Sequence, residues 1–214
     1  FGQEDFAPLT SGSPSKIEKA HAEMRRIEAG AIKNPDEGRK VTHFTDRMNY
    51  TDLPLFREVE EFAESVRADP GLDHVLINGI GGSALGPQLV QFAVNGPYWN
   101  ELGAGQRNGY PRMYFVDNTD SAGLVDARQA IELERTLVVT ISKSGGTQET
   151  RNNMVALEQA YADAGIDFPS HAAAITMAGS KLDSYATNNG WRRIFHMAES
   201  IGGRTSETNV VGHI

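Results

Sequence analysis

Short apolar runs alternate with longer segments of helical periodicity from Gly71 to the last residue. This alternation constrains the fold strongly, because strands separated by helices form a parallel sheet that helices cover on both faces. The expected strands lie at 75–77, 113–116, 137–141, 173–177 and 194–197. The expected helices lie around 84–95, 121–133, 148–164 and 181–189. The sequence therefore predicts an α/β fold, a three-layer α/β/α sandwich with a five-stranded parallel sheet.

The first 71 residues carry helical signals and no strand pattern. We expect a loose lead-in at 1–12, a helix from Ser13-Pro14 to Gly30 and a second helix from Pro54 to about Asp69. The segment between the helices has a turn signal at 34–38 and no sustained period, and it is expected to be irregular. We therefore expect an N-terminal helical segment, 1–71, that packs on the sheet of a domain at 72–214.

Composition narrows the classes of function. The net charge of −8 disfavours non-specific binding to nucleic acid, which needs a basic surface. The chain has no cysteine, so it offers no disulfide framework and no thiolate metal site, as in many cytoplasmic proteins. It also has no apolar run near the ~20 residues of a membrane span and no signal-peptide pattern. Because it begins at Phe1, we expect a processed chain or a piece of a longer protein.

A polar loop, 142–147, follows the third apolar run and precedes a helical pattern. A strand-to-helix junction gathers backbone N–H groups at the positive end of a helix dipole. Here Ser142, Ser144 and Thr147 add hydroxyls and Lys143 adds an ammonium group, which together favour a phosphate monoester. The loop is not a nucleotide-binding P-loop, because its lysine precedes its glycines. The alternative is an ordinary turn in which the glycines supply backbone freedom and Thr147 caps the helix.

The loop after the first predicted strand is rich in glycine. Gly79, Gly81 and Ala84 match the spacing of a dinucleotide-binding fingerprint, but the acidic candidate Asp117 lies well beyond the ~20 residues expected. The other interpretation is an anion or sugar contact from the backbone at 81–82 and the hydroxyl of Ser83.

A third loop follows the last predicted strand and contains Arg204 after two glycines. Glycines at 202 and 203 allow the backbone to come close to a ligand, and the arginine can neutralise negative charge that develops on oxygen. The alternative is an arginine paired with a surface carboxylate. Ligands bind beyond the carboxyl ends of parallel strands, so we expect the loops after Ile77, Ile141 and Met197 to meet.

The segments 79–87, 142–150 and 202–212, in this order, resemble the first sugar isomerase (SIS) domain of the glucose-6-phosphate isomerase family. The resemblance covers about 73–212 and implies an SIS-type fold. It implies that the phosphate-binding residues are Ser142, Lys143, Ser144 and Thr147. It further implies substrate contacts from Gly82 and Ser83, and an enediolate intermediate stabilised by Arg204.

The family's reaction interconverts glucose 6-phosphate and fructose 6-phosphate without a metal or another cofactor, so the implied partner is a hexose 6-phosphate. The family's base and its ring-opening residues belong to a second SIS domain and a C-terminal segment, whose motifs do not occur in these 214 residues. We therefore expect an N-terminal fragment that is inactive alone. Full-length members are expected to be homodimers, and exposure of the interdomain face would favour self-association of the fragment.

Two alternatives remain from the sequence. One is a stand-alone SIS module that senses sugar phosphates, and the other is a dinucleotide-binding domain. The six histidines show no metal-binding spacing, and His213 is not promoted to a catalytic role.

Overall fold

A five-stranded parallel sheet forms the centre of the computed structural model, which describes residues 14–33 and 38–214. The strand order is β2-β1-β3-β4-β5. The strands are β1 (His74–Asn78), β2 (Arg112–Val116), β3 (Thr136–Ile141), β4 (Ala172–Thr176) and β5 (Arg193–His196). Each strand coincides with a predicted apolar run to within a few residues. The expected α/β fold with a five-stranded parallel sheet is confirmed.

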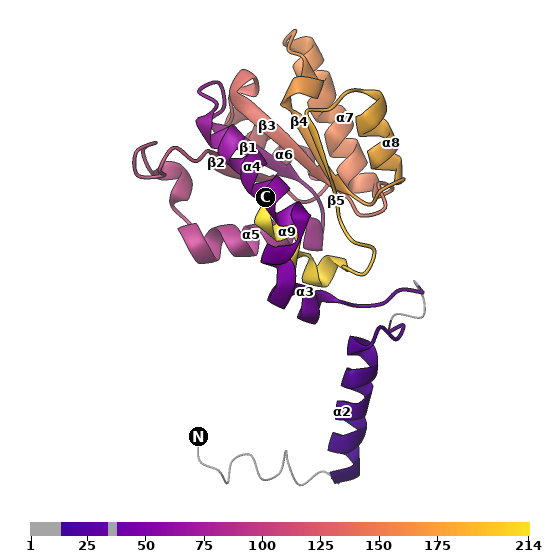
Figure 1. Ribbon diagram of the computed structural model, residues 1–214. Helices are drawn as coiled ribbons and strands as arrows, with labels where there is room; N and C mark the ends of the chain where they lie inside the picture. Colours follow the sequence, from indigo (N-terminus) through magenta and orange to yellow (C-terminus); the bar gives the residue numbers. More distant parts are fainter. Residues whose placement is uncertain (1–13, 34–37) are drawn as a thin grey trace.

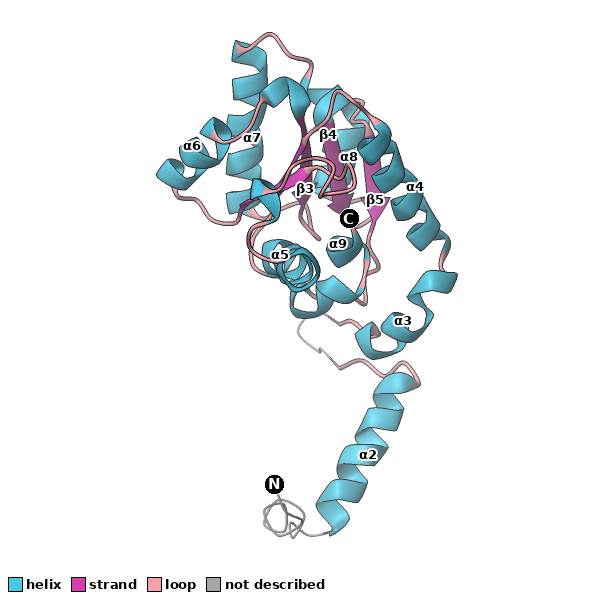
Figure 2. Ribbon diagram, turned by 90° about the vertical axis from the view of Figure 1, so that its left-hand side faces the viewer, coloured by secondary structure: helices cyan, strands magenta, loops and turns pink. Residues whose placement is uncertain are grey.

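Helices cover both faces of the sheet (Figures 1 and 2). They are α4 (Pro54–Ala68), α5 (Gly82–Asn95), α6 (Ser121–Gln129), α7 (Gln148–Asp163), α8 (Lys181–Asn188) and the short α9 (Val210–His213). Val75 and Ile77 of β1 join a core cluster with Val59 of α4, whereas Leu76 joins a second cluster with Leu157 of α7. Because successive side chains of a strand point to opposite faces, one apolar run supplies both cores.

The central strand β3 is buried along its whole length. Val138, Val139 and Ile141 are fully shielded from solvent. A parallel strand that is covered on both faces has no solvent side, and for this reason the run reads as continuously apolar. Its two polar residues are Thr136, which begins the strand, and Thr140, which lies close to the end where the loop 142–147 begins.

The N-terminal helices differ in how they are placed. Helix α4 packs on the sheet, where Val59 and Val66 are buried in the core. Helix α2 (Pro14–Glu28) stands away from the sheet (Figure 1) and exposes Ile17 and Met24. The predicted lead-in at 1–12 and most of the predicted turn at 34–38 lie outside the described residues. The division of the chain at residue 71 stays a prediction.

The segment before α4 is more regular than expected. A short helix α3 (His43–Asn49) and a 3₁₀ turn, η2 (Tyr50–Asp52), occupy a stretch for which irregular structure was predicted. That prediction was wrong at these positions. The helix contains no buried residue, so its sequence has no apolar period from which it could be recognised.

Candidate functional site

Three loops meet beyond the carboxyl ends of the strands, as expected. The loop after β1 touches the loop after β5 at two glycines: a side-chain carbon added to Gly82 would lie 1.6 Å from the carbonyl oxygen of Gly203. The hydroxyl of Ser206 donates a hydrogen bond to the carbonyl of Gly82 at 2.9 Å. Ser206 belongs to a 3₁₀ turn, η6 (Gly203–Thr208), that packs against α5.

The loop after β3 reaches the same place through Lys143. Its ammonium Nζ donates a hydrogen bond to the carbonyl oxygen of Glu199 at 2.5 Å. Glu199 precedes the two glycines and Arg204 in the third loop. The lysine predicted to bind phosphate therefore contacts the segment that carries the predicted catalytic arginine.

The loop 142–147 is folded by its own hydroxyls and amides. Ser142 Oγ donates to Thr147 Oγ1 at 3.2 Å, and the amide of Gly146 donates to Ser144 Oγ at 3.2 Å. Thr147 is the N-cap residue of α7, but its side chain makes no capping hydrogen bond. The sequence alternative, in which Thr147 caps the helix, therefore does not describe this loop.

The loop requires glycine at position 145 for two structural reasons. Its φ of +65° lies in the left-handed region, which favours glycine. A side-chain carbon there would also lie 2.2 Å from the amide nitrogen of Leu182. The backbone of the loop therefore packs directly against the first turn of α8. A side chain at position 145 would clash with this turn and displace the loop.

A hollow of about 510 Å³ opens beside this loop, between α7 and α8. Its lining combines loop residues with side chains of both helices: Thr140, Ser142, Gly145, Gly146, Thr147, Gln148, Thr150, Arg151, Met154, Val155, Lys181, Leu182 and Tyr185. Two of the predicted phosphate ligands, Ser142 and Thr147, line it. Arg151 and Lys181 add positive charge, so the hollow suits an anion.

Asn78 contacts the first turn of α7, the helix that follows the loop 142–147, and our sequence interpretation missed this residue. The residue is fully buried at the end of β1, and its Nδ2 donates to the carbonyl of Thr150 at 3.0 Å. The contact ties the end of β1 to the first turn of α7. A polar residue that ends an apolar run was the signal that could have identified it.

The loop 197–202 is held by the N-terminal segment. Thr42 Oγ1 lies 2.7 Å from Ser200 Oγ, and Arg39 Nη1 donates to the carbonyl of Ser200 at 3.4 Å. The same guanidinium covers Gly202, where an added side-chain carbon would lie 2.7 Å from Nη2. The expectation that both glycines of this loop open toward a ligand is corrected at Gly202, whose open side is filled by Arg39.

The side chain of Arg204 is exposed, at the second position of η6. At the other end of the loop, β5 is tied to α8 by His196 Nε2, which lies 2.8 Å from Asp183 Oδ1. That contact and a hydrogen bond from the amide of Gly179 hold the pKa of Asp183 below its ordinary value. Arg204 thus projects from a loop that is fixed at both ends.

The comparisons with known proteins identify the family. A sequence model described as phosphoglucose isomerase matches residues 16–214. The chain belongs to the phosphoglucose isomerase family. Glucose-6-phosphate isomerases from Gloeothece citriformis and a Synechococcus strain are 41% and 42% identical to it, over 97% and 96% of this chain. A glucose-6-phosphate isomerase structure from Chlamydia trachomatis superposes with a TM-score of 0.76 and is 30% identical over 92% of this chain.

The 214 residues correspond to part of the length of their phosphoglucose isomerase family relatives. The chain spans 40% of the length of the two curated relatives and 39% of the Chlamydia chain. Within the described residues, no group of three or more His, Cys, Asp or Glu side chains is arranged to hold a metal ion. None of the helices in that part of the chain is long and apolar enough to cross a lipid bilayer.

Proposed function

We propose that this chain binds hexose 6-phosphates as the first SIS domain of a glucose-6-phosphate isomerase, which interconverts glucose 6-phosphate and fructose 6-phosphate through an enediolate. The observation that carries the proposal is the meeting of three loops, joined by Lys143 to Glu199 and by Gly82 to Gly203, in a chain of this family.

The proposed roles follow from the chemistry of each group. The phosphate is bound by hydroxyl and ammonium donors of the loop 142–147, namely Ser142, Lys143, Ser144 and Thr147. Gly82 and Ser83 contact the substrate from the start of α5, where backbone N–H groups point outward. Arg204 neutralises the charge that develops on oxygen in the enediolate. Binding energy from the remote phosphate orients C1 and C2 for proton transfer.

We further propose that the chain does not catalyse isomerisation alone. The reaction needs a carboxylate base that moves a proton between C1 and C2, together with groups that open the sugar ring. The family motifs that supply these groups do not occur in the 214 residues. The chain thus contributes the part of the active site that binds phosphate and stabilises charge. The isomerase to which it belongs would act in glycolysis or gluconeogenesis in the cytoplasm.

Calorimetric titration with 6-phosphogluconate tests the binding proposal. We expect saturable binding that Lys143→Ala weakens at least 10-fold, which corresponds to about 1.4 kcal/mol. The matched control is Lys16→Ala on the exposed side of α2, which should bind like the unmodified chain. Equal affinity in Lys143→Ala and the control would refute the assigned role of Lys143.

A steady-state assay with fructose 6-phosphate tests the second part of the proposal. The assay uses concentrations at which the titration shows the binding site to be fully occupied. We expect no turnover above background under these conditions. Robust turnover would show that the base lies within these residues.

A further inference from the structure

The hollow between α7 and α8 holds two positive charges that the proposed function does not use. Arg151, near the start of α7, and Lys181, the first residue of α8, both line it. Among the described residues, neither of them forms an ion pair or a side-chain hydrogen bond. The chain carries a net charge of −8, so carboxylates are more numerous than basic groups. Two unpaired basic side chains at one hollow therefore favour an anion from outside the chain.

Both helices also begin at this hollow, α7 at Gln148 and α8 at Lys181. The first backbone N–H groups of a helix have no partner within the helix and carry its positive partial charge. A side-chain carbon at Gly145 would lie 3.0 Å from the amide nitrogen of Lys181, so α8 begins directly beside the loop 142–147. Helical side chains tilt toward the N-terminus, so Arg151 extends back toward the same loop. Two helix ends and two side chains thus make this end of the hollow positive.

A buried hydroxyl without a partner belongs to the same hollow. Thr150 lines it and is only 2% exposed, and its Oγ1 has no hydrogen-bond partner among the described residues. Thr140, which also lines the hollow, accepts a hydrogen bond from Asn78 Nδ2 at 3.4 Å and keeps its own proton to donate. A polar group that is buried without a partner costs free energy and is rare in folded proteins. An oxygen atom of a ligand is the partner that these two hydroxyls lack.

The other walls of the hollow are apolar or aromatic. Met154 and Val155 line it from α7, and Leu182 and Tyr185 line it from α8. The hydroxyl of Tyr185 donates to the carboxylate of Glu158 at 2.9 Å, which fixes the position of its ring. Apolar walls with a few polar groups at one end are typical of sites for small organic molecules, and the volume of about 510 Å³ is in the usual range.

The hollow is separate from the place where the three loops meet. Leu182 belongs to one core cluster of the sheet, whereas Ile201 and Val210, which flank Arg204 in the chain, belong to the cluster on the other face. Lys143 extends away from the hollow and donates to the loop of Arg204. Neither Lys143 nor Arg204 is among the residues that line the hollow. The loop 142–147 therefore lies between two sites.

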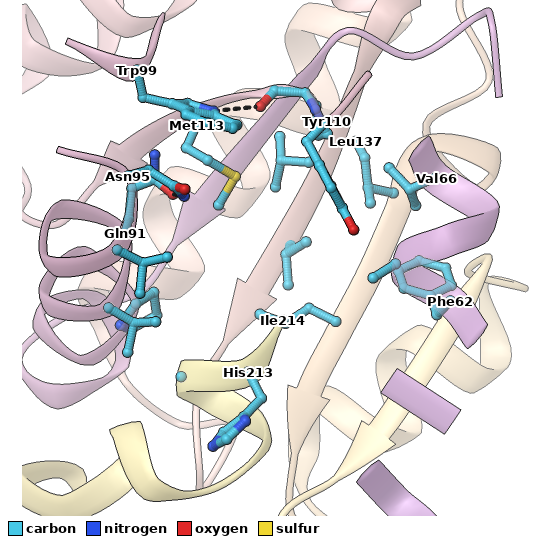
Figure 3. A pocket seen from close by; sticks show the side chains of 18 residues that line it. Phe62, Val66, Gln91, Asn95, Trp99, Tyr110, Met113, Leu137, His213 and Ile214 are labelled. Carbon is cyan, nitrogen blue, oxygen red and sulfur yellow. Dashed lines mark hydrogen bonds between the residues drawn. The ribbon is translucent and has the colours of Figure 1, made fainter. Parts of the chain in front are cut away.

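An apolar groove of about 400 Å³ between α4 and α5 has a different chemistry (Figure 3). None of the described side chains that line it carries a carboxylate, an ammonium or a guanidinium group. Burial lowers the pKa of His213 in its wall, which favours the neutral ring. Unpaired positive charge thus distinguishes the hollow between α7 and α8 from this groove.

We propose that the hollow between α7 and α8 is a second anion site, which binds a phosphate monoester with an apolar or aromatic body. Arg151 and Lys181 bind the phosphate oxygens, and the hydroxyl of Thr150 donates to one of them. Met154 and Tyr185 pack against the body of the ligand. The proposal goes beyond sugar-phosphate binding and does not rest on it.

NMR of the isotopically labelled chain, titrated with phenyl phosphate, tests the site. We expect saturable shifts of the amide signals of Lys181 and Leu182, with a dissociation constant that rises roughly 10-fold in Arg151→Ala and in Lys181→Ala, because each loses a hydrogen bond to a charged group. The matched control is Arg128→Ala, which removes an exposed arginine of α6 and should bind like the unmodified chain. Absence of shifts at Lys181 and Leu182 would overturn the proposal. Equal affinity in Arg151→Ala, Lys181→Ala and the control would also overturn it.

Inorganic phosphate tests the class of ligand. It lacks a body to pack against the apolar walls, so it should shift the same amide signals with roughly 10-fold weaker affinity than phenyl phosphate. Equal affinities would contradict a site for a monoester and indicate one for an inorganic anion only.

Lys143→Ala separates this site from the sugar-phosphate site. The variant should bind phenyl phosphate in the hollow as the unmodified chain does, whatever its affinity for 6-phosphogluconate. Loss of the Lys181 and Leu182 shifts in Lys143→Ala would mean that the chain has one anion site rather than two, and would overturn the proposal. Failure of 6-phosphogluconate to bind would instead count against the proposed function alone.

Thr150→Val tests the unpartnered hydroxyl, because valine keeps the shape of the side chain. The hydroxyl has no partner in the protein, so the melting temperature should not fall, whereas the dissociation constant of phenyl phosphate should rise roughly 5-fold. A lower melting temperature with unchanged binding would show a structural role and contradict the assignment of Thr150. Circular dichroism of each variant establishes that it is folded, so that loss of binding is not mistaken for unfolding.

Discussion

The backbone of Gly82 lies against the carbonyl group of Gly203, so closely that a side-chain carbon at Gly82 would stand 1.6 Å from the carbonyl oxygen. These residues follow β1 and β5, which are separated in the sheet by β3 and β4. The contact arises because η6 packs along α5. It brings the loop of Arg204 to the start of the helix that carries Ser83, and the predicted site depends on that approach.

Gly82→Ala should therefore separate these loops. We expect a loss of roughly 1–3 kcal/mol in the free energy of unfolding, the usual cost of forcing an extra carbon into a packed contact. Urea denaturation measures it. Gly105→Ala is the matched control, because nothing lies within 4 Å of an added carbon there. If both variants unfolded at the same urea concentration, the close contact at Gly82 would not exist in solution.

Asn78→Asp should destabilise the protein in a pH-dependent way. The side chain keeps its size but loses the amide that donates to Thr150, and a carboxylate then faces a carbonyl oxygen inside the protein. The expected loss at pH 7 is roughly 3 kcal/mol, because the buried charge faces a carbonyl oxygen and the hydroxyl of Thr140, 3.4 Å from Asn78 Nδ2, is a distant donor. Burial raises the pKa of the introduced carboxyl, so the deficit should shrink as the pH falls and the group becomes neutral. Urea denaturation at pH 7 and pH 5 measures both effects, and a deficit that grows toward pH 5 would contradict this prediction.

Asp73→Asn should be more damaging than an ordinary surface substitution. Asp73 Oδ1 lies 2.8 Å from Nη2 of Arg107, a residue that is only 1% exposed, and its other oxygen contacts Arg112. Removing the carboxylate leaves a buried guanidinium without its counter-charge, at a cost of roughly 3–5 kcal/mol. The comparison variant is Asp126→Asn, whose carboxylate is exposed on α6. Thermal melting of the two variants should differ clearly, and similar melting temperatures would argue against the buried pair.

His74 should make the stability depend on pH. Its ring is 5% exposed, and burial lowers the pKa of the imidazole, an effect that the neighbouring Asp73 carboxylate partly offsets and Arg112 reinforces. The folded state therefore prefers the neutral ring. The resulting stabilisation is complete above the unfolded value of about 6.5 and decreases as the pH falls through the lowered folded pKa.

His74→Phe should flatten this part of the pH profile. Urea midpoints measured between pH 7.5 and pH 5 should fall less in the variant than in the unmodified chain. His21→Gln, on the exposed helix α2, should retain the full decrease. An unchanged slope in His74→Phe would mean that other groups cause the decrease.

The strands and the three loops were predictable because their signals are local. The run 137–141 is apolar at nearly every position, as a doubly covered parallel strand must be, and the polar loop after it ends where α7 begins. Helix α3 was not predictable, since none of its residues is buried and no period marks it. The hydrogen-bond partner of Thr147 was also not predictable. The sequence shows that Thr147 precedes the helix, but it does not show that its hydroxyl bonds to Ser142.

The sequence by itself determined the parallel sheet, the order of its motifs and the donors available to a phosphate. Apolar periodicity reports burial, and hydroxyl, amide and ammonium groups keep their chemistry wherever the chain places them. Only the tertiary structure decided what the glycines contact: Gly82 meets Gly203, Gly145 meets Leu182, and Gly202 lies under Arg39. It also decided that Lys143 reaches Glu199. These relationships join residues far apart in the chain, and they follow from how strands and helices pack rather than from any local pattern.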